Sequence, residues 1–179
     1  MRIVVSGTHA TGKSTLISDF ALAHPEFAVL PDPFELVDET TGSGAGSFVA
    51  QLRISAERLL APASRRAVIA ERGPLDFLAY LDALDALGRS SAAAGLLRRE
   101  APLAARAMAG VDLIVLLGGD QRIAVPDDED PELREAMAAS LLELADDEDL
   151  TGAASVIELH GDPAQRLAGL EAAVAALEG

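Results

Sequence analysis

The sequence predicts an α/β fold in which helices cover a parallel sheet. Five short runs rich in Val, Ile and Leu alternate with longer segments whose apolar residues recur at helical spacing. The 179 residues, half of them hydrophobic, are enough for one domain with a sizeable core and leave no room for a second. We therefore expect a single domain over residues 1–179, built as a three-layer structure of helices, sheet and helices.

The apolar runs define the expected strands, and the amphipathic segments define the expected helices. The strands cover residues 2–6, 27–30, 67–70, 112–117 and 155–159. The helices cover residues 13–23, 47–60, 74–87, 92–109, 131–144 and 163–177. The last helix has a clear start, because Asp162 supplies an N-cap oxygen and Pro163 needs no amide partner. Two segments, about 40–47 and 118–131, are rich in turn-forming or acidic residues, and we expect them to be mobile.

Composition excludes several classes of function. Twenty-nine acidic and 14 basic residues give a formal net charge of −15, which argues against a nucleic-acid partner. The chain has no cysteine, and its three histidines lack ligand spacing, which excludes disulfides and cysteine zinc sites and suits a reducing cytoplasm. No uncharged apolar stretch reaches the ~18 residues of a membrane span. We expect a cytoplasmic protein without membrane or nucleic-acid partners.

A glycine-rich loop between the first strand and the first helix indicates phosphate binding. Its sequence GTHATGKST fits G-x-x-x-x-G-K-[ST], in which backbone amides and a helix N-terminus form a nest for phosphates. Lys13 is expected to reach the β- and γ-phosphates as a catalytic residue, and Ser14 to bind Mg²⁺. A chance glycine turn is the alternative. The residues expected to bind the nucleotide are Gly7, Thr8, His9, Ala10, Thr11, Gly12, Lys13, Ser14 and Thr15.

Lys13 is the only lysine of the chain, because the other thirteen basic residues are arginines. A compact ammonium fits between phosphates and backbone where a planar guanidinium does not, which supports the phosphate-binding interpretation. Regulatory GTPases read guanine with a motif that contains lysine, so a Ras-like switch is excluded. The choice between ATP and GTP as the bound nucleotide stays open.

Charged residues follow the second and third strands, at the sheet edge where α/β folds bind ligands. Glu71 is expected to hold Mg²⁺ through water or to bind a substrate hydroxyl, and Arg72 to bind a phosphate or sugar oxygen; capping of the next helix is their alternative role. Asp32, fixed between two prolines, is the candidate general base, with Glu35 as substitute. A turn acid exposed to solvent is the alternative for Asp32.

Four more polar residues are candidates for the site. Gln51 and Arg53 lie on the second expected helix and are candidates for binding the acceptor, although a solvent-facing helix surface gives the same pattern. Arg122 is the only basic residue of segment 118–131 and the candidate catalytic arginine of a closing lid. Arg134, at the start of the next helix, is a second candidate for the γ-phosphate. Ordinary surface arginines are the alternative for both.

Four segments in this order, SGTHATGKSTL, FVAQLRISAERLL, VIAERGPLDFLAYL and VIELHGDPAQRLAGLEAAV, resemble the NadR-like P-loop kinases. That group includes the ribosylnicotinamide kinase domain of the bacterial NAD regulator and is more distantly similar to thymidylate and deoxynucleoside kinases. The resemblance covers nearly the whole chain. It implies a P-loop NTPase fold with a five-stranded parallel sheet in the order 2-3-1-4-5, ATP with Mg²⁺ as donor, and a nucleoside-like acceptor.

The resemblance also assigns roles by position. It implies that residues 7–15 form the phosphate loop, that Glu71 and Arg72 are the acid and the arginine after the third strand, and that Asp32 is the acid of an acid-proline pair. Two departures stand out: the third-strand acid is usually aspartate in the family, and the arginine-rich lid is reduced here to Arg122.

We therefore expect an ATP- and Mg²⁺-dependent phosphotransferase that acts on a nucleoside or a nucleoside-like alcohol. Its partners would be a nucleoside triphosphate, ATP or GTP, and a small-molecule acceptor, and the protein would be a monomer or a homodimer. Two alternatives remain open. One is a regulatory ATPase or GTPase with little turnover, and the other is an antibiotic-modifying phosphotransferase.

Overall fold

The sheet has the strand order and direction that the sequence and its family resemblance predict. A computed structural model describes residues 1–36, 44–61, 67–118 and 130–179. Within these residues the strands are β1 (Arg2–Ser6), β2 (Phe27–Leu30), β3 (Ala67–Glu71), β4 (Leu113–Leu117) and β5 (Ser155–Leu159). All neighbours pair in parallel, in the order β2-β3-β1-β4-β5. The expected fold class is therefore confirmed.

The six expected helices are all present, with ends that differ from the prediction by at most two residues. They are α1 (Lys13–Ala23), α2 (Ala45–Leu60), α3 (Pro74–Ala86), α4 (Ala93–Met108), α5 (Pro131–Ala145) and α7 (Pro163–Glu178). Two short helices were not expected, η1 (Pro33–Leu36) and α6 (Glu148–Thr151). Each of them has only four residues, too few to show a helical period in the sequence.

The two segments expected to be mobile are described only in part. Residues 40–43 and 119–129 lie outside the described residues. The rest of segment 40–47 differs from the prediction, because Gly44 is the N-cap of α2 and residues 45–47 form the first turn of that helix. At the other segment, Asp130 caps α5 by accepting hydrogen bonds from the amides of Glu132 and Leu133.

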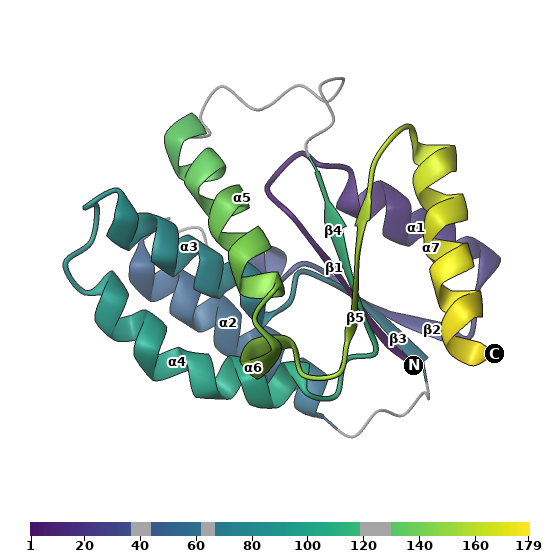
Figure 1. The fold of residues 1–179 in the computed structure, drawn as a ribbon, viewed down its shortest axis with the longest axis horizontal. Helices are drawn as coiled ribbons and strands as arrows, with labels where there is room; N and C mark the ends of the chain where they lie inside the picture. Colours follow the sequence, from purple (N-terminus) through teal and green to yellow (C-terminus); the bar gives the residue numbers. More distant parts are fainter. Residues whose placement is uncertain (37–43, 62–66, 119–129) are drawn as a thin grey trace.

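The sheet separates two hydrophobic clusters, so the molecule has three layers (Figure 1). Alternate residues of β1 contribute to opposite sides: Ile3 and Val5 belong to the cluster with α1 and α7, and Val4 to the cluster with α2, α3, α4 and α5. Because all the strands are parallel, their carboxyl ends lie at one edge of the sheet. At this edge β1 continues into the glycine-rich loop and β3 into the turn before α3. Within the described residues, no helix is both long and apolar enough to cross a bilayer.

Candidate active site

The glycine-rich loop joins the end of β1 to the start of α1 and bends through three left-handed residues. Gly7 has a φ of 148°, Ala10 of 53° and Gly12 of 88°. A Cβ on Gly7 would also lie 2.7 Å from the carbonyl oxygen of Leu117, so glycine is required there by space as well as by backbone conformation. Gly12 caps α1 without a side chain, which leaves the first amides of the helix for an anion.

Lys13 is the first residue of α1, and only 4% of it is exposed. Its Nζ donates a hydrogen bond to the carbonyl oxygen of Thr8, at 2.7 Å, across the interior of the loop. Burial, together with the nearby Arg72 guanidinium, lowers the pKa of Lys13 to about 7, although nearby carboxylates oppose the shift. The ammonium is therefore held inside the loop in an environment that gains from an added negative charge.

Ser14 and Glu71 bring oxygen atoms together beside the loop. The Ser14 hydroxyl donates to Glu71 Oε1 at 2.8 Å, which links the start of α1 to the end of β3. Burial raises the pKa of Glu71, while the Ser14 hydrogen bond and the Lys13 charge lower it. A hydroxyl and a carboxylate are ligands that suit Mg²⁺. The described residues contain no group of three or more His, Cys, Asp or Glu side chains that could hold a metal, so the pair is at most part of a coordination shell.

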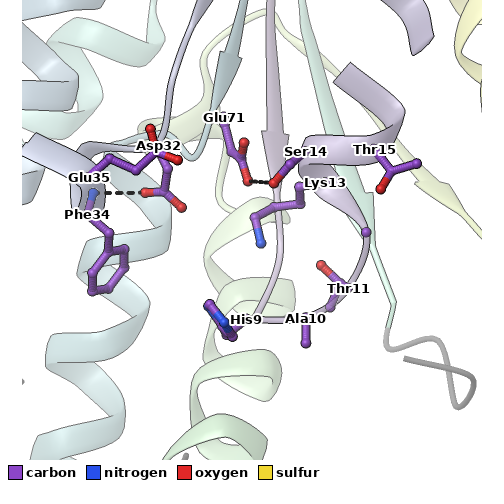
Figure 2. A pocket seen from close by; sticks show the side chains of 11 residues that line it. His9, Ala10, Thr11, Lys13, Ser14, Thr15, Asp32, Phe34, Glu35 and Glu71 are labelled. Carbon is purple, nitrogen blue, oxygen red and sulfur yellow. Dashed lines mark hydrogen bonds between the residues drawn. The ribbon is translucent and has the colours of Figure 1, made fainter. Parts of the chain in front are cut away.

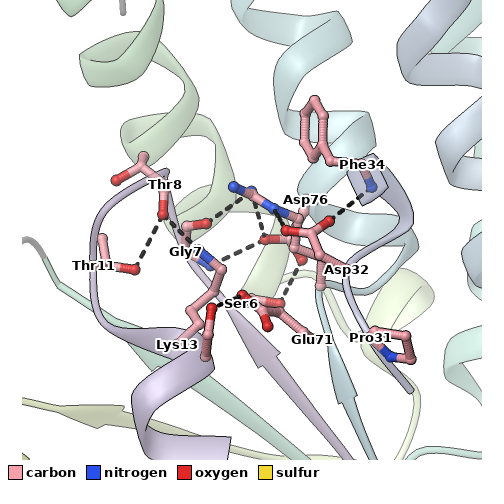
Figure 3. Close-up of polar contacts among 12 residues, drawn as sticks. Ser6, Gly7, Thr8, Thr11, Lys13, Pro31, Asp32, Phe34, Glu71 and Asp76 are labelled. Carbon is pink, nitrogen blue, oxygen red and sulfur yellow. Dashed lines mark hydrogen bonds and ion pairs between the residues drawn. The ribbon is translucent and has the colours of Figure 1, made fainter. Parts of the chain in front are cut away.

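Arg72 connects the glycine-rich loop to the strand-end acid Asp32, which Figure 3 shows with its hydrogen bond from Phe34. The side chain is 1% exposed, and its residue has a left-handed φ of 61°. Its Nε donates to Asp32 Oδ2 at 2.8 Å, and its Nη1 donates to the carbonyl oxygen of Gly7 at 2.9 Å. Asp32 Oδ1 accepts a further hydrogen bond from the amide of Phe34, at 3.0 Å. The Asp32 carboxylate is thus fixed in position relative to the loop.

Asp76 is a structural acid whose role the sequence analysis missed. It is completely buried on the first turn of α3, and it accepts hydrogen bonds from the Ser6 hydroxyl and the amides of Gly7 and Gly73 at 2.7 to 3.0 Å. Burial raises the pKa of Asp76. The Arg72 guanidinium, 3.8 Å away, and the three hydrogen-bond donors oppose this rise. Its place three residues after Gly73 is the sequence signal that predicts such a cap. Asp76 ties the ends of β1 and β3 to α3.

The loop, the two strand-end acids and η1 surround a pocket of about 400 Å³. Figure 2 shows the loop residues on one side, Asp32, Phe34 and Glu35 on the other, and Glu71 between them. The lining residues are His9, Ala10, Thr11, Gly12, Lys13, Ser14, Thr15, Asp32, Phe34, Glu35 and Glu71. Most of the residues predicted for the site therefore meet at one cavity, with Gly7, Thr8 and Arg72 among the contacts that support it.

Phe34 forms an aromatic wall of the pocket that the sequence analysis did not identify. Its ring is 38% exposed and lies 5.0 Å from the Arg72 guanidinium carbon. Behind it, Phe77 and Tyr80 lie with ring centroids 5.8 and 6.2 Å away. An exposed ring held by buried rings offers a flat surface to a planar ligand. Its position two residues after Asp32 is the only hint in the sequence.

Gln51 and Arg53 do not line the pocket. Gln51 is 2% exposed on α2, where its Nε2 donates to the Ser47 hydroxyl and its Oε1 has no hydrogen-bond partner among the described residues. Arg53 forms a two-pronged ion pair with Glu100 of α4, at 3.0 and 2.7 Å. That contact holds α2 against α4 and leaves the guanidinium engaged away from the loop.

The two arginines considered for the lid differ in what the structure describes. Arg122 lies outside the described residues. Arg134, in the first turns of α5, donates from Nε to the hydroxyl of Thr8 at 3.3 Å. A cationic side chain of α5 is therefore in contact with the glycine-rich loop.

The sequence of the chain matches a known protein family. Residues 2–166 match the family model described as an AAA domain, which is most of the chain. The chain belongs to this AAA domain family. The match of the AAA domain includes the phosphate loop, both strand-end acids and the first residues of α7. The comparison with curated proteins gave no match.

Solved structures share the fold of this AAA domain at low sequence identity. Deoxyadenosine kinase from M. mycoides with bound dATP superposes with a TM-score of 0.75 at 12% identity, covering 98% of this chain and 100% of the other. Thymidylate kinase from Candida albicans gives 0.69 at 14%, covering 99% and 92%. The NadR protein in complex with NR gives 0.70 at 15%, covering 98% of this chain and 51% of NadR. The resemblance to NadR and to nucleoside and nucleotide kinases is thereby confirmed at the level of fold.

Proposed function

We propose that this protein is an ATP- and Mg²⁺-dependent phosphotransferase that acts on a nucleoside or nucleoside-like alcohol. One observation carries the proposal: a single pocket has a phosphate loop with its lysine on one side and the fixed carboxylate of Asp32 on the other, with Glu71 between them. Such a pocket brings a triphosphate and a hydroxyl together, and phosphoryl transfer depends mainly on that positioning.

The donor would lie on the loop side of the pocket. The loop amides and the start of α1 would bind the β- and γ-phosphates, and Lys13 would move its ammonium from the Thr8 carbonyl to the phosphate oxygens. Ser14 and Glu71 would hold Mg²⁺, which would neutralise negative charge on the phosphates. Arg134, already at Thr8, would add positive charge from α5, and Arg122 is proposed as the arginine of the lid.

The acceptor would lie on the side of η1. Asp32 Oδ2 accepts from Arg72 and Oδ1 accepts from the Phe34 amide, which fixes the carboxylate. The second lone pair of Oδ1 would take the proton of the acceptor hydroxyl as the acceptor oxygen bonds to the γ-phosphorus and the bond to the β-phosphate oxygen breaks. Glu35 would bind a further hydroxyl, and Phe34 would stack on a planar base. Gln51 and Arg53 would act at most by shaping α2 behind this side.

The structural neighbours support the choice of substrates. They are named for, or were solved with, nucleoside or nucleotide compounds: a deoxyadenosine kinase with dATP, a thymidylate kinase, and NadR with NR or with NAD and AMP-PNP. Carried over to this chain, they favour a nucleoside-type acceptor and ATP as donor, with GTP as the other candidate. We propose that residues 1–179 act as one cytoplasmic domain, as a monomer or a homodimer.

Acceptor-dependent formation of ADP tests this function. Purified protein with MgATP is offered nucleosides including ribosylnicotinamide, then nucleotides and aminoglycosides, and product is read by coupled assay and mass spectrometry. We expect ADP release to rise with a nucleoside and the product to gain one phosphate. Lys13→Ala should abolish transfer, whereas Arg98→Ala, at an exposed position of α4, should leave it unchanged.

The remaining outcomes separate the alternatives. Tight MgATP or MgGTP binding in calorimetry without transfer to any acceptor would support a regulatory nucleotide-binding protein. Transfer to aminoglycosides alone would support an antibiotic-modifying enzyme. A protein that shows no binding heat and no shift of melting temperature with either nucleotide would overturn the proposal as a whole.

A further inference from the structure

Arg166 of α7 is a buried cation whose guanidinium contacts the backbone of the glycine-rich loop. It is 5% exposed, its Nη1 donates to the carbonyl oxygen of Thr11 at 2.6 Å, and its Nη2 donates to the carbonyl oxygen of Gly118 at 3.4 Å. Its Nε is buried and has no hydrogen-bond partner within the described part of the chain. Among the described residues no carboxylate forms an ion pair with it, unlike Arg72, which has Asp32 and Asp76.

The contact with Thr11 fixes one peptide unit of the loop. The bond between Thr11 and Gly12 is trans, so the carbonyl of Thr11 and the amide of Gly12 point in opposite directions. With the carbonyl held by Arg166 on the α7 side, the Gly12 amide is directed away from α7, toward the concave side of the loop. Gly12 lines the pocket and has a left-handed φ of 88°.

The charge of Arg166 adds to this effect. A cationic donor on a carbonyl polarises the peptide group, which makes its amide a stronger donor on the other side. A buried guanidinium without a carboxylate also carries an unbalanced desolvation cost. Phosphate anions bound on the far side of the same peptide would reduce that cost, so the charge favours the occupied loop over the empty one.

The start of α7 sets the position of this side chain. Asp162 caps the helix by accepting from the Gln165 amide, and Gln165 in turn accepts from the Asp162 amide, both at 2.9 Å. The Arg166 amide then donates to the Asp162 carbonyl, at 3.0 Å, in the first turn. Since α7 packs beside α1 on the same face of the sheet (Figure 1), this turn brings Arg166 to the Thr11 carbonyl of the loop.

We propose that Arg166 is a positioning residue for the donor triphosphate, because it holds and polarises the Thr11–Gly12 peptide so that the Gly12 amide faces the phosphates. The inference rests on the proposed binding of a nucleotide at the loop. It assigns to the C-terminal helix a part in donor binding that is separate from the acceptor side of the pocket.

The test compares Arg166→Met and Arg166→Lys with the wild type and with Arg98→Met, a matched loss of charge at an exposed position of α4. Calorimetry measures the affinity for MgATP and for inorganic tripolyphosphate, and steady-state assays measure KM for the acceptor. We expect Arg166→Met to weaken both phosphate ligands roughly tenfold or more, the size of a lost charged hydrogen bond, without a change in acceptor KM. Arg166→Lys should recover part of the affinity, and Arg98→Met should behave as wild type.

NMR on the ¹⁵N-labelled wild type tests the inference even if the Arg166 variants fail to fold. The Gly12 amide proton should move downfield on addition of MgATP or tripolyphosphate, and this shift should be smaller in Arg166→Lys. Unchanged affinity in a folded Arg166→Met, or a Gly12 amide that does not respond in the wild type, would overturn the inference. A wild type that binds no nucleotide would instead refute the proposed function, and with it this role.

Discussion

Glu71 accepts a hydrogen bond from Ser14, with 2.8 Å between Oε1 and Oγ, although the two residues are 57 positions apart in the sequence. The contact exists because β3 lies beside β1 and both strands end at the same edge of the sheet. It places two oxygen ligands at the corner of the phosphate loop, and the first prediction follows from it.

Replacement of Glu71 by Gln should weaken the affinity for Mg²⁺, because the side chain loses its charge while its shape is almost unchanged. We expect the Mg²⁺ concentration for half-maximal activity to rise roughly 10- to 100-fold, as is typical when a group that supports a metal site is changed. A magnesium titration at saturating ATP measures it. Ser14→Ala should act in the same direction, and the double variant should lose less than the sum of both. Unchanged magnesium curves for both single variants would contradict the assignment.

Nucleotide binding should take up a proton at alkaline pH. The pKa of Lys13 is about 7 in the empty loop, so at pH 8 only about one molecule in ten carries the ammonium, whereas a bound triphosphate favours it. Affinity should therefore be flat below pH 6 and fall by up to about tenfold per pH unit above pH 7. Calorimetry in two buffers of different ionisation enthalpy should give an uptake near one proton at pH 8. The same uptake at pH 6 and pH 8 would refute this origin.

Removal of the Arg72 guanidinium should destabilise the protein strongly. Arg72→Met leaves Asp76 fully buried without its cation, and loss of one partner of a buried ion pair costs about 3–5 kcal/mol. Urea unfolding at pH 8 measures the change, with Arg98→Met as the exposed control. Without Arg72, burial raises the pKa of Asp76 further, so its protonation at pH 5 should shrink the deficit. An equal deficit at both pH values would argue against the buried charge as the cause.

Phe34 should affect the acceptor and not the donor. Its exposed ring faces the pocket from η1, on the side opposite the phosphate loop. Phe34→Leu keeps an apolar side chain but removes the flat face, so we expect acceptor KM to rise roughly tenfold, the worth of one lost stacking contact. The KM for ATP should stay within experimental error. An equal change in both KM values would indicate a general distortion of the pocket.

Two glycine substitutions should change stability in opposite directions. A Cβ at Gly73 would lie 2.7 Å from Val4 Cγ1 in the core, so Gly73→Ala should lower the free energy of unfolding by about 1–3 kcal/mol. Gly95 lies within α4 with no atom near the added Cβ, so Gly95→Ala should raise it by about 0.5–1 kcal/mol. Urea denaturation of both variants measures these changes. Stability that does not fall in Gly73→Ala would contradict the tight packing of the turn.

Much of the fold could be predicted because its elements carry local patterns. The apolar run of β4 and the Asp162–Pro163 start of α7 are visible in the sequence and appear where expected. The glycine-rich loop could be predicted to bind phosphate because that function requires a fixed spacing of glycine, lysine and serine. Helix α6 escaped prediction, since four residues in one turn have no period to detect.

Outside the glycine-rich loop, the site was predictable only where an acid or a base follows a strand. Glu71, Asp32 and Glu35 were expected near the loop, and all three line its pocket. Arg53 also looked like a candidate, but its charge is engaged by Glu100 of α4, and a contact between two helices cannot be read from either of them alone. Asp76 and Phe34 gave weak signals because capping acids and apolar rings are common in sequences of every kind.

The sequence alone determined which strands and long helices form, in what order, and that a glycine-rich loop with the phosphate-binding pattern follows the first strand, because these properties depend on residues close together in the chain. Only the tertiary structure decided which distant side chains meet. The pairing of β1 with β3 brings Glu71 to Ser14 and Arg72 to Gly7, and the packing of α7 beside α1 brings Arg166 to Thr11. These contacts join residues 57 to 155 positions apart in the sequence. They form because parallel strands end at one common edge of the sheet, where the segments that follow them meet.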